Sequence, residues 1–262
     1  MWMQQALRDR KAIRIEHGQR NEFDDQVIEE LPIAMLYNGV SYAVMMATPT
    51  DLEDFALGFS LSEGIVENIE QFSFIEALKN DLGVSIEMVI PQAQFDLLAE
   101  RRRNTAGASG CGLCGVESIQ AAMRPAPKVN SHQRISIDAI TQGVQALSEQ
   151  QPLNQKSGGV HAAGFVHADG ILAREDVGRH NALDKLIGAL AKQNLGNGFL
   201  VLSSRASYEL VHKAATANIG IVVAISAPTS MAIQLAESCG ITLICFARGE
   251  QMNVYTHAAR LV

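Results

Sequence analysis

The sequence predicts an α/β protein made of two unequal parts, and three patterns support this prediction. In the second half, short apolar runs alternate with helical segments of about 10–15 residues, the pattern of βαβ units and a parallel sheet. Two of these runs, residues 199–202 and 221–225, are apolar throughout, as expected for strands covered on both faces. The first half pairs its strands through a tight turn, which is typical of a smaller α+β unit.

The bulk properties restrict the class of protein. The 262 residues suffice for one large domain or two unequal ones, and 47% hydrophobic with 19% charged residues is ordinary globular usage. A net charge of −7 argues against nucleic acid as a partner. No apolar stretch reaches the ~18 residues of a membrane span, and residues 1–30 lack the apolar run of a signal peptide. We therefore expect a cytoplasmic protein without membrane contact, in a compartment where disulfides are rare.

The first domain is expected to span residues 1–104. Its residues 1–25 are polar and are expected to form a frayed or loosely docked tail. The apolar runs 31–37 and 40–46 flank Asn38-Gly39, the strongest short signal for a β-hairpin. The elements expected to follow are a helix over 51–62 with a capping box at Thr50 to Glu53 and an end at Gly64, a strand over 84–90 and a helix over 93–103.

A linker over residues 105–133 is expected to follow. It is rich in glycine and proline and shows little periodicity apart from a possible helical turn over 116–123. Loops of this length without structure of their own are usually functional or disordered. The linker also carries Cys111 and Cys114, so we expect it to be a mobile, functional connection.

The second domain is expected to span residues 134–262. A hairpin is expected to turn at Asp169-Gly170, and the βαβ pattern then continues to the end of the sheet. The sequence predicts helices over 136–148, 181–192, 207–218 and 230–238, and strands over 162–167, 171–174, 199–202, 221–225 and 241–246.

The chemical centre of the sequence is the run from Gly110 to Gly115, which contains Cys111 and Cys114. A Cys-x-x-Cys pair suits half of a zinc site, but only His132 lies near enough to add a ligand and a fourth is missing. A thioredoxin-like redox pair would stand between a strand and a helix, whereas this pair stands in a glycine-rich loop. The third chemistry is sulfur transfer, in which one thiolate carries a persulfide and the partner thiol releases or protects it.

The flanking residues favour sulfur transfer. Glycines allow the close approach of another protein, and the arginines at 101–103 would lower the pKa of a nearby thiol. A structural thiol pair and a partial zinc site remain the alternatives. We expect Cys239 and Cys245, which fall in a predicted helix and strand, to be small buried side chains.

Polar segments follow three of the predicted parallel strands, at residues 203–207, 226–230 and 247–249. Ligands of open α/β sheets bind at the carboxyl ends of strands, where the next helix offers free N–H groups to an anion. Ser204 lies in the first segment, and Arg205 and Arg248 are suited to phosphate. The alternative is that the serines of these segments only cap helices.

A charged stretch precedes the predicted helix over 181–192. Its Glu175 and Asp176 fit the first turn of a helix as dipole partners, while Arg179 and His180 are candidates to face a ligand. His161, which follows two glycines, is a further candidate for the same site. The alternative for His161 is structural, since buried histidines usually satisfy a hydrogen-bond partner.

The chain resembles the FdhD family, the formate dehydrogenase accessory sulfurtransferases, from about Leu31 to its end. The resemblance rests on many motifs in the same order. These motifs are Val40 to Met46, Asp54 to Gly64, Gly110 to Gly115, His161 to Ala163, Glu175 to His180 with Ala182 to Lys185, Ser203 to Glu209, and Val254 to His257.

The resemblance implies a sulfur carrier required for formate dehydrogenase activity. It implies that Cys111 accepts sulfur as a persulfide from a cysteine desulfurase, and that Cys114 is the accessory thiol. The sulfur then goes to the molybdenum cofactor, a bis(molybdopterin guanine dinucleotide), before that cofactor enters formate dehydrogenase. GDP or GMP is the expected mimic of the cofactor, and the family is dimeric, which implies a homodimer.

The resemblance also implies site residues and a fold. The cofactor site includes the segment before Val254, namely Phe246, Ala247, Arg248, Gly249, Glu250 and Gln251, together with our candidates Ser204, Arg205, His161 and His180. The C-terminal domain resembles a cytidine deaminase fold, but no paired thiolates stand at the matching segments 175–180 and 203–207, so zinc deamination is not expected.

Two departures from the family stand out. Some relatives carry a cysteine where this chain has Gly159, so a third thiol near His161 is not available, and the segment that begins at Phe246 varies among relatives. An alternative function stays open, a maturation chaperone that binds the guanine cofactor without sulfur chemistry. The sequence leaves open which partner each thiol faces and which formate dehydrogenase is served.

Overall fold

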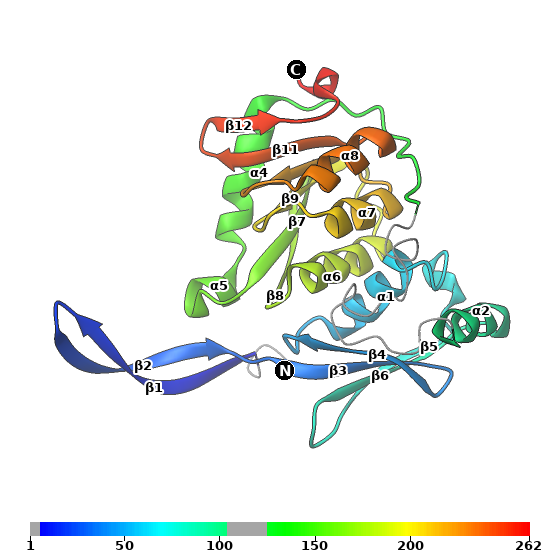
Figure 1. The fold of residues 1–262 in the computed structure, drawn as a ribbon, viewed down its shortest axis with the longest axis horizontal. Helices are drawn as coiled ribbons and strands as arrows, with labels where there is room; N and C mark the ends of the chain where they lie inside the picture. The colour runs from blue at the N-terminus through cyan, green and yellow to red at the C-terminus, as the bar shows by residue number, and fades with distance from the viewer. Residues whose placement is uncertain (1–5, 104–124) are drawn as a thin grey trace.

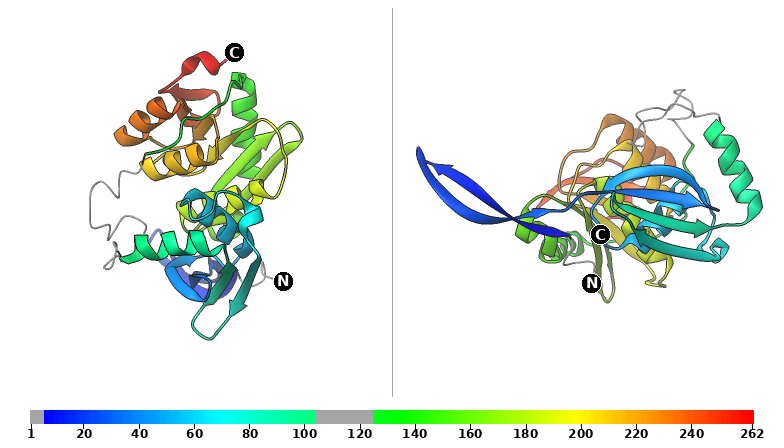
Figure 2. Two further views of the ribbon diagram at one scale, coloured as in Figure 1. Left: turned by 90° about the vertical axis from the view of Figure 1, so that its right-hand side faces the viewer. Right: turned by 90° about the horizontal axis from the view of Figure 1, so that it is seen from below.

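A computed structural model describes residues 6–103 and 125–262 (Figures 1 and 2). These residues form three sheets, a two-stranded ribbon, a four-stranded sheet and a six-stranded sheet. The two larger sheets lie on either side of a pair of packed helices, and the ribbon projects from the body (Figure 1). The fold is therefore a mixed α/β arrangement with several sheets.

The four-stranded sheet has the order β4-β3-β6-β5. The predicted hairpin is confirmed, with Asn38 at φ 49° and Gly39 at φ 80°, the two positive angles that a tight hairpin turn needs. The elements of this part are β3 (Leu31–Tyr37), β4 (Val40–Ala47), α1 (Leu52–Ser62), the 3₁₀ helix η2 (Ile69–Gln71), β5 (Phe74–Lys79), β6 (Val84–Val89) and α2 (Gln92–Arg103).

The six-stranded sheet has the order β12-β11-β10-β9-β7-β8. The prediction of a parallel sheet holds for β9, β10 and β11, whereas β7, β8 and β12 run antiparallel to their neighbours. The elements are α4 (Ile137–Glu149), α5 (Pro152–Ser157), β7 (His161–His167), β8 (Gly170–Asp176), α6 (Arg179–Ala191), β9 (Gly198–Leu202), α7 (Tyr208–Thr216), β10 (Ile221–Ala224), α8 (Ser230–Cys239), β11 (Thr242–Arg248), β12 (Gln251–Val254) and η3 (Ala258–Arg260).

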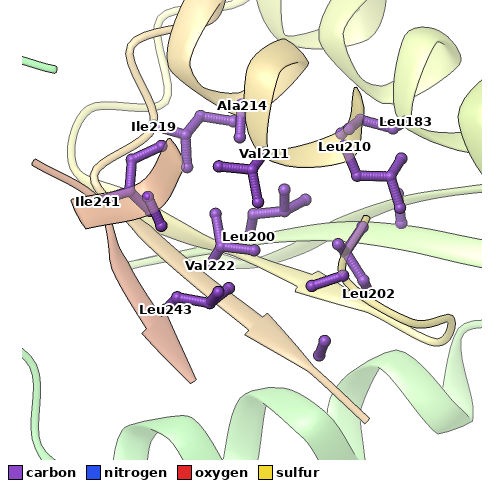
Figure 3. Close-up of a cluster of buried hydrophobic side chains, with 14 of the residues drawn as sticks. Leu183, Leu200, Leu202, Leu210, Val211, Ala214, Ile219, Val222, Ile241 and Leu243 are labelled. Atoms are coloured by element: carbon purple, nitrogen blue, oxygen red, sulfur yellow. The ribbon is translucent and has the colours of Figure 1, made fainter. Parts of the chain in front are cut away.

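Both faces of the six-stranded sheet are covered. On one face, α6, α7 and α8 pack their apolar side chains against the strands, as Leu210 and Val211 do over Leu200 and Val222 (Figure 3). On the other face, α4 places Ile140 and other apolar residues against the same strands. This double cover explains why the central strands are apolar throughout.

Helices α1 and α6 join the two parts through a close crossing. A Cβ atom added at Gly58 would lie 1.7 Å from the carbonyl oxygen of Asp184, and one at Gly188 would lie 1.9 Å from that of Asp54. Each helix therefore carries a glycine where the partner backbone passes. No helix within residues 6–103 and 125–262 combines the length and the apolar character that crossing a membrane requires.

Two details of the sequence predictions are wrong. The capping box is absent, because Asp51 sits at the start of α1 in a left-handed conformation without a side-chain cap bond, and the hydroxyl of Thr50 bonds Lys185 instead. The polar tail is also not frayed from Leu7 on. It forms β1 (Leu7–Glu16) and β2 (Gln19–Ile28), joined at His17-Gly18.

Among the described residues, the short elements that escaped prediction are β5, α5, β12 and the 3₁₀ helices η2 and η3. The ribbon escaped because neither of its faces is buried, so both carry charges and the usual apolar alternation is hidden. Strands β5 and β12 lie at the edges of their sheets, where one side of the strand meets solvent and the pattern weakens.

Candidate functional site

The carboxyl ends of β9, β10 and β11 meet at one edge of the six-stranded sheet. Strand β7 runs antiparallel to β9, so its first residue, His161, lies at the same edge, paired with Asp176 at the end of β8. Helices α6 and α7 both begin at this edge. The fold thus brings His161 and His180 to the same edge as the segment around Ser204, the segment for which the strand-end rule predicts a ligand site.

His180 is held by a carboxylate that the sequence analysis did not assign. It lies in the first turn of α6, and its Nε2 is 2.6 Å from Oε2 of Glu209, in the first turn of α7. This contact with His180 is the main cause that lowers the pKa of the Glu209 carboxyl, against the opposing effect of burial. The pair ties the starts of α6 and α7 together at the edge of the sheet.

The surroundings of His161 disfavour the protonated form of its imidazole. Burial is the main cause that lowers the pKa of its imidazole, and the nearby charges of Arg179 and His180 lower it further, against Asp176. A neutral imidazole keeps one donor and one acceptor nitrogen, so His161 can either give or take a hydrogen bond from a ligand.

Two polar atoms at this edge are buried without a hydrogen-bond partner among the described residues. They are Nε of Arg179 and the hydroxyl oxygen of Ser207. Ser207 stands before α7 but makes no side-chain cap bond, and Gly178 before α6 has no side chain to cap with. Unsatisfied donors at two neighbouring helix starts favour an anionic ligand.

The serines after β9 are bound to the backbone. The hydroxyl of Ser203 accepts a hydrogen bond from the Ala162 N–H at 2.8 Å and so joins β9 to β7. Ser204 is buried, and its hydroxyl donates to the carbonyl of Arg205 at 3.0 Å. Arg205 itself is exposed. In this segment it is therefore Arg205 that stays available to a ligand.

Phe246 carries the most unusual backbone at the edge. Its φ is 54°, in the left-handed region that a bulky residue rarely adopts. The register between β11 and β12 shifts there, between Cys245 and Arg248, and the Phe246 ring is 39% exposed. A bulge with backbone strain that presents an aromatic ring to solvent is typical of a binding site.

The rest of the segment turns between β11 and β12. Ala247 faces the core and is 1% exposed, so its side chain is not available and only its backbone can meet a ligand. Arg248 is exposed and its Nε donates to the Ile225 carbonyl at 3.2 Å. Gly249 at φ 56° and Glu250 form the turn, and Gln251 begins β12.

These residues form a strip along the edge. His161 on β7 and Phe246 on β11 are separated by β9 and β10, and three strand spacings amount to about 14 Å. The strip carries three arginines, Arg179, Arg205 and Arg248, beside the carboxylates of Glu209 and Glu250. A ligand that touches both ends must be elongated.

The turn that precedes α6 and positions Arg179 and His180 is held by the buried side chain of Asp176. The buried carboxylate of Asp176 accepts hydrogen bonds from the backbone N–H groups of Thr48 and Gly178 and from the Asn181 side chain. It also pairs with the buried ammonium of Lys185 at 2.7 Å. The four-stranded part thus contributes directly to the shape of the site.

The predicted role of Glu175 and Asp176 in the first turn of α6 is wrong. Both residues end β8, before α6 begins at Arg179. The carboxylate of Glu175 instead accepts hydrogen bonds from the N–H groups of Leu153 and Asn154, and so caps α5. Glu209 is the residue that the sequence analysis did not single out, and its place in the first turn of α7, at the end of the motif from Ser203 to Glu209, was the available signal.

Cys111 and Cys114 lie outside the described residues, as does the helical turn expected over 116–123. Cys239 and Cys245 are buried as predicted, and burial raises the pKa of the Cys245 thiol to about 12. Within the described ranges, no cluster of three or more histidine, cysteine or carboxylate side chains is arranged to hold a metal.

The chain is similar to named proteins over most of its length. The model of the FdhD/NarQ family matches residues 28–262. The sulfur carrier protein FdhD of Xanthomonas oryzae pv. oryzae is 51% identical over 256 residues, covering 96% of this chain and 91% of that protein. The protein of the same name from Cupriavidus necator is 49% identical over 242 residues, covering 90% of this chain and 84% of that protein.

A solved structure shares the fold. It is a protein from Desulfotalea psychrophila described as a formate dehydrogenase accessory protein, with a TM-score of 0.76 and 24% identity. The match covers 98% of this chain and all of that one. At this identity the likeness concerns the mixed α/β fold. The cytidine-deaminase-like arrangement of the C-terminal domain stays a prediction.

Proposed function

The chain belongs to the FdhD/NarQ family, and from this premise we propose that it is a sulfur carrier that serves formate dehydrogenase. The observation that carries the proposal is the 51% identity, over 96% of the chain, to a protein named as a sulfur carrier. Its finer parts are a persulfide on Cys111, a cysteine desulfurase as the donor, and the bis(molybdopterin guanine dinucleotide) cofactor as the acceptor.

Loading is a thiol exchange that leaves the electrons balanced. The thiolate of Cys111 attacks the outer sulfur of a persulfide on the desulfurase. The donor's S–S bond breaks, a new S–S bond forms on Cys111, and the donor cysteine leaves as a thiolate. This step needs reduced thiols, so the cytoplasm is the compartment that suits it.

Release uses the second cysteine. The thiolate of Cys114 attacks the inner sulfur of the Cys111 persulfide, and the outer sulfur leaves as sulfide with the electron pair of the broken bond. Cys111 and Cys114 become a disulfide, which a cellular thiol reductant must open before the next cycle. The sulfide becomes the ligand that the molybdenum cofactor receives.

The strip at the sheet edge suits that cofactor. An exposed aromatic ring such as Phe246 can stack on a guanine base, which is worth about 1–3 kcal/mol per base. The exposed Arg205 and Arg248 suit the phosphates of a guanine dinucleotide. The two ends of the strip, about 14 Å apart by strand spacing, fit an elongated ligand better than a compact one.

The cysteines have enough chain to reach the strip. Residues 125–133 are anchored at the opposite edge of the sheet, where the Val129 N–H bonds the Cys239 carbonyl. Cys114 precedes Pro125 by 11 residues, and a chain of that length extends to at most roughly 40 Å. That exceeds the length of a five-residue strand, about 17 Å.

A mass measurement tests the proposal. Incubation with a cysteine desulfurase and cysteine should add one sulfur atom to the intact wild-type mass, and Cys111→Ala should abolish the addition. Cys114→Ser should load normally but fail to release sulfide. An absent adduct on wild type, or an equal one on Cys111→Ala, overturns the carrier role.

The alternative is a maturation chaperone that binds the guanine cofactor without sulfur chemistry. It is favoured if the Cys111→Ser, Cys114→Ser double variant still activates formate dehydrogenase in cells that lack the wild-type protein. Metal analysis of protein purified without chelator tests the remaining zinc alternative for the cysteine pair, which near-stoichiometric zinc would support.

A further inference from the structure

The facing sides of α6 and α7 carry two pairs of polar side chains, one helical turn apart. The two helices lie side by side on the six-stranded sheet (Figure 1). Residues four positions apart share one side of a helix. The outer pair is His180 of α6 and Glu209 of α7, with Nε2 and Oε2 2.6 Å apart. The inner pair is Asp184 of α6 and Lys213 of α7, with Oδ1 and Nζ 2.8 Å apart.

The inner pair is sufficient to join the two helices to each other and to α1. Lys213 is buried, and its ammonium donates to Asp184, to Ser62 at 2.8 Å and to Glu63 at 3.3 Å. Ser62 and Glu63 stand at the end of α1. An ammonium has three hydrogens, so these three partners use its full donor capacity. Lys213 therefore has no hydrogen left for Glu209.

The outer pair is much more open than the inner pair. The side chains of Lys213 and Asp184 are 9% and 2% exposed, whereas those of His180 and Glu209 are 31% and 25% exposed. Nε2 of His180 is itself buried, so the open part of the ring lies away from Glu209. The ring can therefore contact Glu209 with one nitrogen and a ligand at the carboxyl edge with the other.

A histidine held in this way is suited to an anion. When a carboxylate lies against one ring nitrogen and a phosphate against the other, two negative groups favour the charged form of the imidazole. Both nitrogens then donate, one to each group. Arg179, which precedes His180, adds a donor, because its Nε has no hydrogen-bond partner among residues 6–103 and 125–262. The outer pair is therefore equipped to bind a phosphate.

The charged groups around the outer pair come from four elements. Arg179 of α6 and Lys213 of α7 act on Glu209, while Asp176 at the end of β8 acts on His161 of β7, the neighbour of the outer pair. The two cations oppose a further positive charge at this place, and the phosphate of a ligand would offset them. We therefore expect the proton to arrive together with the ligand.

We propose that Glu209 is a positioning residue, which fixes His180 so that its second nitrogen binds a phosphate of the guanine cofactor and His180 takes up a proton from solvent as the phosphate binds. Phe246 on β11 is two strands from β9, the strand that leads into α7. Two strand spacings amount to about 10 Å, which the base and phosphates of one nucleotide can bridge. The inference rests on the cofactor part of the proposed function and names the ligand group that His180 receives.

Calorimetry of GDP binding tests the proposal. Titrations at about pH 7.5 in two buffers of different ionisation enthalpy give the number of protons taken up per GDP. We expect wild type to take up a sizeable fraction of one proton, because His180 becomes charged in the complex. Arginines alone would give the opposite sign, since a positive neighbour promotes the loss of a proton from phosphate. Guanosine, which has no phosphate, should bind without proton uptake.

The variant Glu209→Gln separates positioning from a structural role. It should bind GDP roughly tenfold more weakly than wild type and take up fewer protons, while its affinity for guanosine stays within about twofold. His180→Gln should abolish the uptake. The double variant should bind GDP no more weakly than His180→Gln alone, because Glu209 acts through His180. A structural role would instead weaken the binding of both ligands and would add to the loss caused by His180→Gln.

The variant Glu63→Gln is the matched control. The side chain of Glu63 is 22% exposed, close to the 25% of Glu209, and it likewise contacts a basic side chain, at 3.3 Å from Lys213. This variant should bind GDP with the affinity and the proton uptake of wild type. Thermal unfolding followed by circular dichroism should show that every variant is folded.

Three results overturn the proposal. The first is GDP binding by wild type without proton uptake. The second is an uptake that persists in both Glu209→Gln and His180→Gln, which would assign the proton to another group such as His161. Both of these results leave the cofactor site and the sulfur carrier in place. The third is a wild type that does not bind GDP, in which case the mass measurement on Cys111 shows whether the carrier role stands without the cofactor site.

Discussion

The two edges of the six-stranded sheet differ in shape and in chemistry. The amino edge is hollow, with cavities of ≈ 490 Å³ beside α4 and ≈ 560 Å³ beside residues 130–133. Two polar side chains of the second cavity have partners, since Asn218 accepts from the Asn130 N–H and Gln193 donates to the Ala189 carbonyl. The carboxyl edge instead holds the donors of Arg179 and Ser207, which have no partner among residues 6–103 and 125–262. A cavity whose polar groups have hydrogen-bond partners is thus a weaker sign of a binding site than an edge with buried, unpaired donors.

The largest expected effect on stability comes from the buried ion pair of Asp176 and Lys185, which holds the carboxyl edge. Lys185→Met leaves the buried carboxylate of Asp176 without its cation, and loss of one partner of a buried pair costs about 3–5 kcal/mol. Urea denaturation should show this loss of unfolding free energy. The control Lys192→Met removes a 37%-exposed partner of Asp54 and should cost about 1 kcal/mol or less. Equal costs for the two variants would contradict a role for burial.

The next effect separates backbone strain from ligand contact at Phe246. Phe246→Gly should be more stable than Phe246→Ala by about 1–2 kcal/mol, because glycine adopts a φ of 54° without strain. Both variants lose the ring, so calorimetry should show GDP bound roughly tenfold more weakly by each than by wild type. Unchanged GDP affinity in both would remove Phe246 from the site.

A smaller effect concerns pH and His161. The folded pKa of this imidazole lies below its ordinary value of 6.5, so the unfolded chain takes up the proton first as the pH falls. The His161 contribution to stability is therefore full above about pH 6.5 and is lost as the pH falls toward the lowered pKa. His161→Asn should lose less stability than wild type between about pH 7.5 and 5.5 in urea denaturation. An identical pH dependence would contradict the burial of this imidazole.

The smallest effect is expected at the amino edge. Gln193→Ala and Asn194→Ala change two residues that line the larger of the two cavities, far along the strands from Phe246. If the carboxyl edge is the binding site, both variants should bind GDP within about twofold of wild type. A tenfold loss of GDP affinity in either variant would indicate that the binding site lies at the amino edge instead.

Much of the fold followed from local patterns. The hairpin at Asn38-Gly39, the helices of the second half and the buried central strands all have signals within a few consecutive residues. The prediction of a capping box is wrong because the hydroxyl of Thr50 accepts a hydrogen bond from Lys185, 135 residues away in the sequence. The strands of the ribbon were not predicted because a strand that buries neither face lacks the apolar alternation that identifies strands in a sequence.

The candidate site was likewise predicted in part. The strand-end rule placed Arg205 and Arg248 at one edge, because parallel strands end together. His161 and His180 reach the same edge because β7 runs antiparallel to β9 and α6 begins there. The rule did not show that the Ala247 side chain faces the core, that the Ser204 hydroxyl is bound by the backbone, or that Glu209 holds His180. Those outcomes depend on which neighbour each side chain meets.

By itself, the sequence determined the family of this protein, its pair of cysteines and the order of most helices and strands, because these rest on short motifs and local periodicity. Only the tertiary structure decided that Phe246 is strained and exposed and that Asp176 is the support of the site. These properties arise from contacts between residues far apart in the chain, and no local pattern of residues encodes such contacts.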